Sequence, residues 1–176
     1  MKQTYKFDPA HSSAQFTVRH MMITNVRGSF SGVEGTVVYD AENPAASTLE
    51  AVISASTVNT CEPPRDAHLK SADFLDVEKY PTMTFKSKQV APAGEGELKV
   101  VGNLTIHGVT KEVALAVEGP TAEAKDPWGN VRVGASATTK IKRSDFGLTW
   151  NAALEAGGLL VGDELKIALD VSMIRA

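Results

Sequence analysis

The stretch that decides the fold lies near the C-terminus and reads Leu165-Lys166-Ile167-Ala168-Leu169-Asp170-Val171-Ser172-Met173. Large apolar residues occupy every second position, and lysine, aspartate and serine stand between them. This period of two is typical of a β-strand with one face against a core and the other in water. Because the apolar face must be covered, the stretch predicts a sandwich or a closed barrel.

The same alternation recurs along most of the chain. Its apolar members are Phe16 and Val18; Leu49, Ala51, Ile53 and Ala55; Leu98, Val100, Leu104 and Ile106; Val113, Leu115 and Val117; and Val131, Val133, Ala135, Ala137 and Ile141. Turn-forming residues separate these runs at 41–44, 126–130 and 162–163. No linker, repeat or low-complexity tract interrupts them. The sequence therefore predicts an all-β, mostly antiparallel fold in a single domain over residues 1–176.

Two places break the alternation. Residues 62–71 start with Glu62-Pro63-Pro64 and have no period of two, which predicts a short helical insertion near residues 63–73. A helix between strands is expected to cover an open end of the barrel as a lid or plug. Near Asp145 the apolar positions change from odd to even numbers, which predicts a bulge or bend there.

The interior of such a barrel is the open question. About eight strands leave a space that side chains fill or that holds one slender ligand. Only 6% of residues are aromatic, and several expected inward positions are small: Ala51, Ala55, Gly102, Ala135 and Ala137. Small apolar walls favour an apolar guest, whereas close packing of leucine, isoleucine and methionine would fill the gap. Both alternatives remain open on the pattern alone.

Composition excludes several classes of protein. The chain carries 18 Lys+Arg against 21 Asp+Glu, a formal net charge of −3, so no nucleic-acid partner is expected. No run approaches the ~20 apolar residues of a membrane helix, so no integral membrane segment is expected. Cys61 is the only cysteine, which excludes an internal disulfide and a Cys-rich zinc site.

The N-terminal eight residues contain no apolar core of a secretory signal. A chain that is complete as written predicts a cytoplasmic protein. A chain whose leader has been removed predicts a periplasmic or secreted one, and the sequence leaves both open.

Catalytic patterns are missing from the sequence. The four histidines, His11, His20, His68 and His107, have no metal-ligand spacing. There is no Gly-x-Ser-x-Gly or Gly-x-x-x-x-Gly-Lys motif, and Cys61 has no evident activating base. We therefore expect no enzymatic activity, no metal and no cofactor.

A set of motifs spread over the whole chain resembles the YceI-like family of lipocalin-like, polyisoprenoid-binding proteins. The matching stretches are 7–12, 16–20, 26–32, 65–76, 80–81, 85–87, 104–111, 126–129 and 143–148. The block Arg65-Asp66-Ala67-His68-Leu69-Lys70 is the most specific of them. The resemblance implies an extended eight-stranded antiparallel barrel with a small helical insertion and a long apolar channel. Members are described as periplasmic or secreted, and dimers occur among them, so a homodimer is a partner to consider.

The function that follows is non-catalytic binding and carriage of a long-chain amphiphile, which is a polyisoprenoid, an isoprenoid quinone or a fatty amide. The candidate channel residues are Phe16, Val18, Phe30, Ile53, Phe85, Leu104, Ile106, Val133, Ala135, Ile167 and Leu169. If the head group is a pyrophosphate, basic residues must gather at the mouth; the candidates are Arg19, His20, Arg27, Arg65, His68 and Arg143. Alternatively, Arg19 and Arg143 pair with nearby carboxylates such as Asp145.

Two other functions remain alternatives. One is an enzyme that acts on an isoprenoid or lipid through His20 or His68. The other is a structural or interaction scaffold with no ligand.

Overall fold

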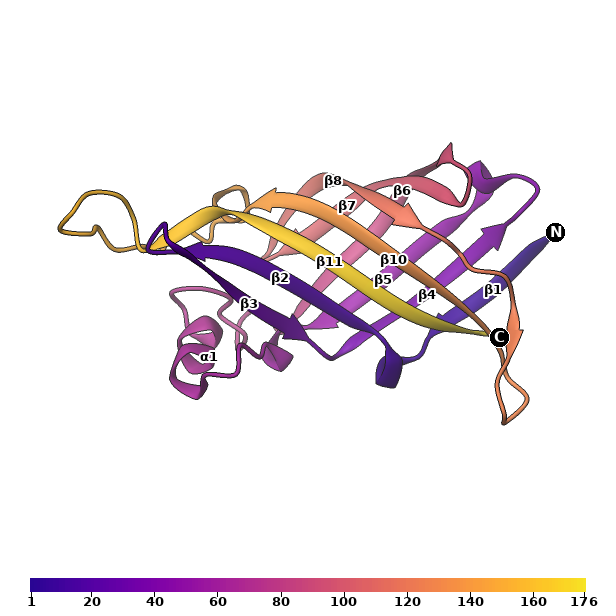
Figure 1. Cartoon of the computed structure of the whole chain (residues 1–176), viewed down its shortest axis with the longest axis horizontal. Helices are drawn as coiled ribbons and strands as arrows, with labels where there is room; N and C mark the ends of the chain where they lie inside the picture. The colour runs from indigo at the N-terminus through magenta and orange to yellow at the C-terminus, as the bar shows by residue number, and fades with distance from the viewer.

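The computed structural model describes all of residues 1–176 and is dominated by one antiparallel sheet of eleven strands (Figure 1). The strands are β1 Lys2–Phe7, β2 Ser13–His20, β3 Thr24–Phe30, β4 Val33–Asp40, β5 Thr48–Ser54, β6 Thr82–Gly94, β7 Glu97–Ile106, β8 Val109–Glu118, β9 Ala124–Lys125, β10 Val131–Lys142 and β11 Val161–Arg175. β11 pairs with β1 and also with β10. This second pairing closes an eight-stranded ring of β1, β4, β5, β6, β7, β8, β10 and β11. The predicted closed antiparallel barrel is therefore confirmed.

The β2–β3 hairpin extends the barrel beyond the ring. β1 and β2 both pair with β11, one after the other along its length, and the 3-10 helix η1 (Pro9–His11) separates them. Asp8 begins η1 by accepting a hydrogen bond from the amide of Ala10 (3.1 Å), and Pro9 suits the first helical position. β3 pairs with β2, and the isolated bridge of Ser29 with Asn59 is the only other β pairing that β3 makes.

The helical insertion lies beside this outer edge (Figure 1). Its helix α1 spans Pro63–Lys70 and is followed by turns up to Tyr80, which confirms the short helix expected near residues 63–73. α1 itself buries no residue. The expected plug is instead the 3-10 helix η4 (Arg143–Phe146), whose Phe146 is only 1% exposed. η4 stands where the sequence predicted a bend, and Gly147 ends it with a positive φ of 75°.

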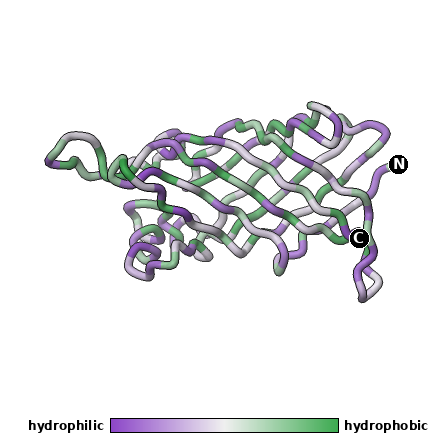
Figure 2. Tube along the Cα trace, viewed as in Figure 1, coloured by the Kyte–Doolittle hydropathy of each residue, from purple (hydrophilic) through white to green (hydrophobic).

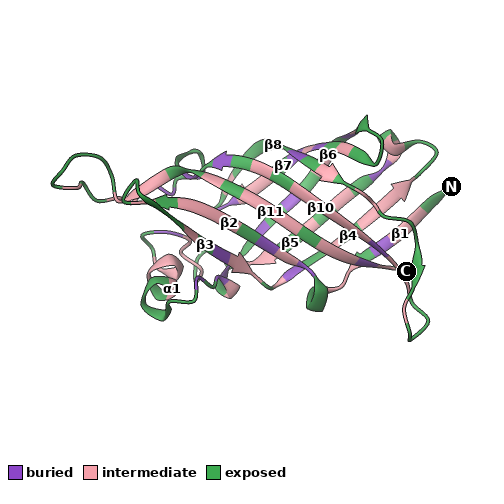
Figure 3. Ribbon diagram, viewed as in Figure 1, coloured by how far each residue is buried: buried purple, intermediate pink, exposed green.

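The termini and the helices mark the two ends of the barrel. Both termini lie at one end, which we call the termini end, and α1 lies toward the other, the plugged end (Figure 1). Apolar and polar residues alternate along the strands (Figure 2), and buried positions are scattered along the barrel (Figure 3). Most of the buried apolar residues fall into three clusters: Ala55, Met83, Ile106, Ile141, Phe146 and Leu148; Phe85, Val90, Val100 and Leu115; and Tyr5, Val133 and Met173. Leu104 and Val113 pack against both of the first two clusters.

Candidate ligand-binding cavity

An apolar cavity of about 190 Å³ lies inside the barrel. Of its 34 lining residues 28 are hydrophobic, and none of the 34 carries a charge. The lining on β7 runs from Leu98 to Ile106, which corresponds to about 27 Å of extended strand. With the usual strand tilt of 35–45°, this is about 20 Å along the barrel axis. The shape suits a slender apolar chain.

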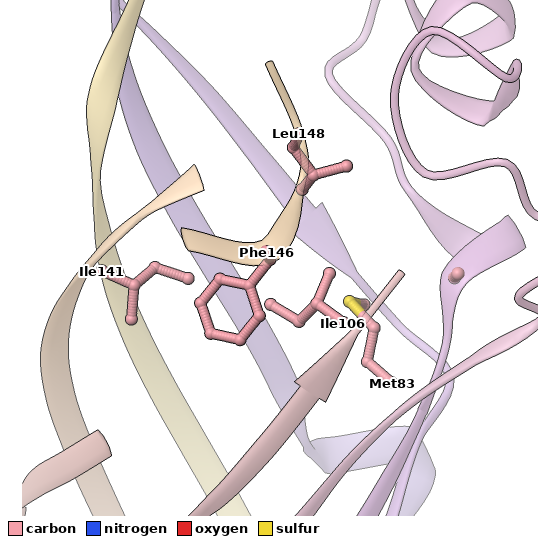
Figure 4. Close-up of a cluster of buried hydrophobic side chains, with 6 residues drawn as sticks. Met83, Ile106, Ile141, Phe146 and Leu148 are labelled. Carbon is pink, nitrogen blue, oxygen red and sulfur yellow. The ribbon is translucent and has the colours of Figure 1, made fainter. Parts of the chain in front are cut away.

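One end of the cavity is closed by packed side chains. Phe146 projects from η4 toward Ile141, Ile106, Met83 and Leu148 (Figure 4). Each of these side chains is at most 7% exposed. Ile106 belongs both to this cluster and to the cavity wall, so the cluster forms the floor of the cavity.

The position of η4 is fixed by Arg143, which is 5% exposed. Its guanidinium donates to the backbone carbonyls of Gly162 (2.7 Å), Leu148 (2.7 Å), Trp150 (2.9 Å) and Val161 (3.1 Å). Burial lowers the pKa of Arg143, and the nearby charge of Asp163 opposes this effect. A guanidinium that uses four of its five N–H groups on its own loop has little left for a ligand head group.

Several glycines leave room for aromatic rings instead of for a ligand. A Cβ atom on Gly28 would lie 2.3 Å from Phe16, and one on Gly102 would lie 2.5 Å from Phe85. The space expected at Gly102 is therefore filled by the ring of Phe85. Open space was also expected beside Ala51, Ala135 and Ala137, and these three residues do line the cavity.

Some of the polar lining residues lie at the termini end, and the others, Gln15, Ser136 and Thr139, lie on β2 and β10. Tyr39, Ser47 and Thr48 line the cavity where β4 ends and β5 begins. Tyr5, also in the lining, donates its hydroxyl to Oε1 of Glu123 (2.8 Å), and Arg175 binds both oxygens of that carboxylate (3.0 and 3.2 Å). Burial first, and the hydrogen bond to Glu123 second, raise the pKa of Tyr5 to about 12. Tyr5 therefore remains a neutral donor over the physiological pH range.

A second polar network braces the same end. Arg132 donates to Oδ2 of Asp126 (2.7 Å) and to Oδ2 of Asp8 (2.7 Å), which joins β10 to the 126–130 turn and to η1. The hydrogen bond from Arg132 is the largest cause that lowers the pKa of both carboxyl groups, in Asp8 to about 2. Oδ1 of Asp126 also accepts the amides of Trp128 and Asn130, which fixes the turn.

The structure places the predicted channel residues as follows. Ten of the eleven lie in the cavity wall: Phe16, Phe30, Ile53, Phe85, Leu104, Ile106, Val133, Ala135, Ile167 and Leu169. Val18 is not among the lining residues, because it lies near the end of β2, opposite Leu165 and Val26. Whether the ten contact a ligand stays a prediction.

The six predicted head-group residues lie toward the plugged end, and none of them lines the cavity. Arg19 and His20 end β2, and Arg19 donates to Asn25 (3.2 Å). Arg27 is exposed on β3, and Arg65 donates to Oγ1 of Thr60 (2.8 Å). The predicted pairing of Arg143 with Asp145 is wrong, because its guanidinium donates to backbone carbonyls, and its role as a head-group residue stays a prediction. The polar groups that do line the cavity, such as Tyr39, were missed because a tyrosine, serine or threonine in a strand gives no distinctive signal.

The two histidines proposed for an enzyme are also outside the cavity lining. His68 lies between Phe74 and Trp150, with ring centroids 5.0 and 4.7 Å away, and Nε2 is 2.8 Å from Oδ2 of Asp73. This arrangement links the insertion to the 147–160 loop. No group of three histidine, cysteine or acidic residues is arranged to hold a metal ion. No helix has the length and apolar character to cross a membrane.

A closed antiparallel barrel around an uncharged apolar cavity defines a lipocalin-like barrel protein. The family description "YceI-like domain" matches residues 5–173. The chain belongs to the YceI-like family.

Relatives and solved structures agree with this assignment. A UPF0312 protein of Yersinia enterocolitica is 37% identical over 174 residues, which cover 98% of this chain and 86% of the relative. A UPF0312 protein of Vibrio cholerae is 40% identical over 139 residues, or 79% of this chain and 73% of the relative. The crystal structure of a Campylobacter jejuni YCEI protein has a TM-score of 0.72 at 32% identity, with 90% of each chain covered.

Two more distant structures share the fold alone. Burkholderia cenocepacia BcnA has a TM-score of 0.80 at 23% identity and covers 94% of this chain and 98% of its own. A polyisoprenoid binding domain from Saccharophagus degradans, implicated in plant cell wall breakdown, has a TM-score of 0.70 at 16% identity, with 99% of each chain covered.

Proposed function

We propose that the protein binds and carries, without chemistry, a long-chain amphiphile such as a polyisoprenoid, an isoprenoid quinone or a fatty amide. The observation that carries this proposal is the cavity wall, which holds 34 residues and no charge. The polyisoprenoid-binding description of the Saccharophagus degradans domain supports the ligand class. An enzyme that uses His20 or His68 has less support, because neither side chain lines the cavity.

The energetics favour recognition of the tail over the head. Each buried CH₂ group contributes about 0.8 kcal/mol, so the affinity grows with every tail carbon that the cavity takes up. Lost translational freedom and ordering of the tail offset an estimated 4–15 kcal/mol of that gain. The gain itself needs no charged contact, which agrees with the uncharged wall.

The proposal also says which end of the ligand lies at each end of the cavity. The tail points to the floor made by Phe146, and the head group lies at the termini end beside Tyr39, Ser47 and Thr48. Tyr5, which also lines the cavity, donates its hydroxyl to Glu123. Hydroxyl donors and acceptors of this kind suit a neutral polar head group.

Filling the cavity tests the proposal. Ala137 lies in the cavity wall on β10, opposite Leu169 on β11 and Val117 on β8. Ala137→Phe is expected to abolish the amphiphile that native mass spectrometry detects on the purified protein and to lower uptake of added polyprenol at least tenfold. The matched control is Ala116→Phe, which places the same ring at an exposed position of β8.

Two results would count against the proposal. One is a wild-type protein that carries no amphiphile and takes up neither polyprenols, quinones nor fatty amides. The other is equal binding by wild type and Ala137→Phe, with both proteins folded.

A further inference from the structure

The plugged end carries an exposed apolar projection that the cavity does not explain. Seven large hydrophobic residues of the chain are exposed, and four of them are here: Met21 (42%), Met22 (64%), Ile23 (68%) and Leu159 (53%). They come from the β2–β3 turn (residues 21–23) and from the loop of residues 149–160, which together we call the tip. The tip extends from the barrel at the end opposite the two termini (Figure 1), and its loop is mostly exposed (Figure 3).

The two loops of the tip are held together. The amide of Met21 donates to the carbonyl of Leu160 (2.7 Å). The Met22 side chain lies against Gly158, because a Cβ on that glycine would be 2.3 Å from Sδ of Met22. The loop is also folded back on itself by a bridge between Ala153 and Leu159. The apolar side chains therefore belong to one defined surface.

The backbone conformation of the β2–β3 turn is unfavourable for the residues that occupy it. Met21 and Met22 have φ values of 51° and 60°, and the amide of Ile23 donates to the carbonyl of His20 (3.1 Å). Positive φ at both central residues is the requirement of a type I′ turn, for which Asn-Gly is the favoured pair. Two methionines strain this turn and also expose apolar surface. Both methionines keep much of their side chains exposed although Met22 packs against Gly158, and a partner that covers the tip would bury this remaining surface.

The charges around the tip narrow the choice of partner. Between His20 and Val26, and between Thr149 and Gly162, Glu155 is the only acidic or basic residue apart from His20 itself. Arg19 and Arg27 are exposed on β2 and β3, directly behind the turn. Apart from Glu155, which is exposed at the turn of the longer loop, the tip is an apolar end with cations on the strands behind it. This order matches the profile of a lipid interface, where acyl chains lie beneath phosphate groups.

We propose that the tip inserts into the interfacial layer of a lipid bilayer and docks the protein there. The partner is a lipid surface because the tip is a projection and not a groove, and a fluid layer can close around a projection. Four partly exposed side chains also offer much less than the roughly 800 Å² per partner of a stable protein interface. The docked protein holds its termini end away from the bilayer. This inference does not rest on the proposed ligand.

Binding to vesicles tests the docking. Wild-type protein is expected to sediment with sucrose-loaded phosphatidylcholine vesicles, and added salt is expected to leave this binding unchanged, because the contact is apolar. The variant Met21→Asn/Met22→Gly restores the favoured turn pair and removes both side chains. It is expected to lower the partition coefficient about tenfold or more, because the free energy of burying two methionine side chains exceeds the free energy of a tenfold change in binding. Its thermal stability should be equal or higher.

Two further variants complete the experiment. Ile23→Ser/Leu159→Ser removes apolar surface without altering a positive-φ residue and should lower vesicle binding similarly. Trp128→Ser is the matched control, because Trp128 is 82% exposed in the turn that links β9 to β10 near the termini end (Figure 1), and it should leave vesicle binding unchanged. Polyprenol uptake by the tip variants should equal that of wild type, which separates a failure of docking from a failure of the proposed function.

The proposal is overturned by any of four results. They are a wild-type protein that does not sediment with phosphatidylcholine vesicles, equal sedimentation by folded tip variants, equal loss in Trp128→Ser, or binding only to anionic vesicles that salt abolishes. A concentration-dependent dimer in sedimentation velocity that the tip variants lose would assign the surface to a second copy and overturn it as well.

Discussion

Replacing Phe146 by alanine perturbs the floor of the cavity and the packing of the plugged end at the same time. Phe146 is 1% exposed and packs in a cluster with Met83, Ile106, Ile141 and Leu148. A buried Phe→Ala change costs about 3–5 kcal/mol. We expect the upper half of this range, because the paired strands around the cluster resist collapse into the vacated space. Against a typical stability of about 5–15 kcal/mol, most of the protein should remain folded.

The same change should lengthen the space available to a ligand. Ile106 lies in the floor and in the cavity wall, so the volume of the missing ring adjoins the existing cavity. Each additional buried CH₂ contributes about 0.8 kcal/mol, which is roughly a fourfold gain in affinity. The variant should therefore prefer longer polyprenols than wild type does.

Urea unfolding measures the stability loss, and native mass spectrometry of protein mixed with equimolar polyprenols of graded length measures the preference. Phe74→Ala is the matched control, because Phe74 is 8% exposed but lies outside the cluster that forms the floor. It should lower stability and leave the length preference unchanged. A loss below about 1 kcal/mol for Phe146→Ala would refute the packing argument. An unchanged length preference in a folded Phe146→Ala protein would refute Phe146 as the floor.

Two other predictions concern the arginines. Asp8 and Asp126 have lowered pKa values, so their stabilisation is present above the ordinary value of 3.8 and is lost as the pH falls toward about 2. Thermal melts should show a gap between wild type and Arg132→Met that is widest above pH 4 and narrows toward pH 2; a gap that stays constant with pH would contradict this origin. Arg143→Met removes the guanidinium donor from four backbone carbonyls, of which that of Val161 still accepts from Asn151, and should cost about 3 kcal/mol or more in urea unfolding. A large loss of affinity at unchanged stability would instead make Arg143 a head-group contact.

The barrel could be predicted from the sequence because alternation is a local consequence of strand geometry. Leu165, Ile167 and Leu169 share a face whatever the rest of the chain does, and β11 places that face inward. Alternation predicts whether a side chain faces the inside or the outside of the barrel, but not how far along the barrel axis the residue lies. Val18 shows this limit, since it has the right parity but lies beyond the lining.

Long-range contacts account for what the sequence could not predict. Nothing near Gly102 shows that the ring of Phe85 would occupy its space. Arg143 is followed by Ser144 and Asp145, so its neighbours suggest a surface ion pair, yet its partners are carbonyls up to 19 residues away. In the sequence, the tip is recognisable only as three consecutive apolar residues, Met21-Met22-Ile23. The structure adds the positive φ values of Met21 and Met22 and the hydrogen bond from Met21 to Leu160, which joins the two loops into one surface.

A cavity in the middle of the barrel removes the packing that usually stabilises a fold of this size, so stability must come from elsewhere. Most of the buried apolar residues fall into three clusters, and two of these clusters lie at the ends. Each end is also fastened by one arginine with several partners: Arg143 joins η4 to the 147–162 segment, and Arg132 joins β10 to η1 and the 126–130 turn. Between the ends, backbone hydrogen bonds of the closed ring hold the wall. Because none of these contacts requires the cavity to be filled, the barrel can keep its shape without a ligand, as the proposed carrier function requires.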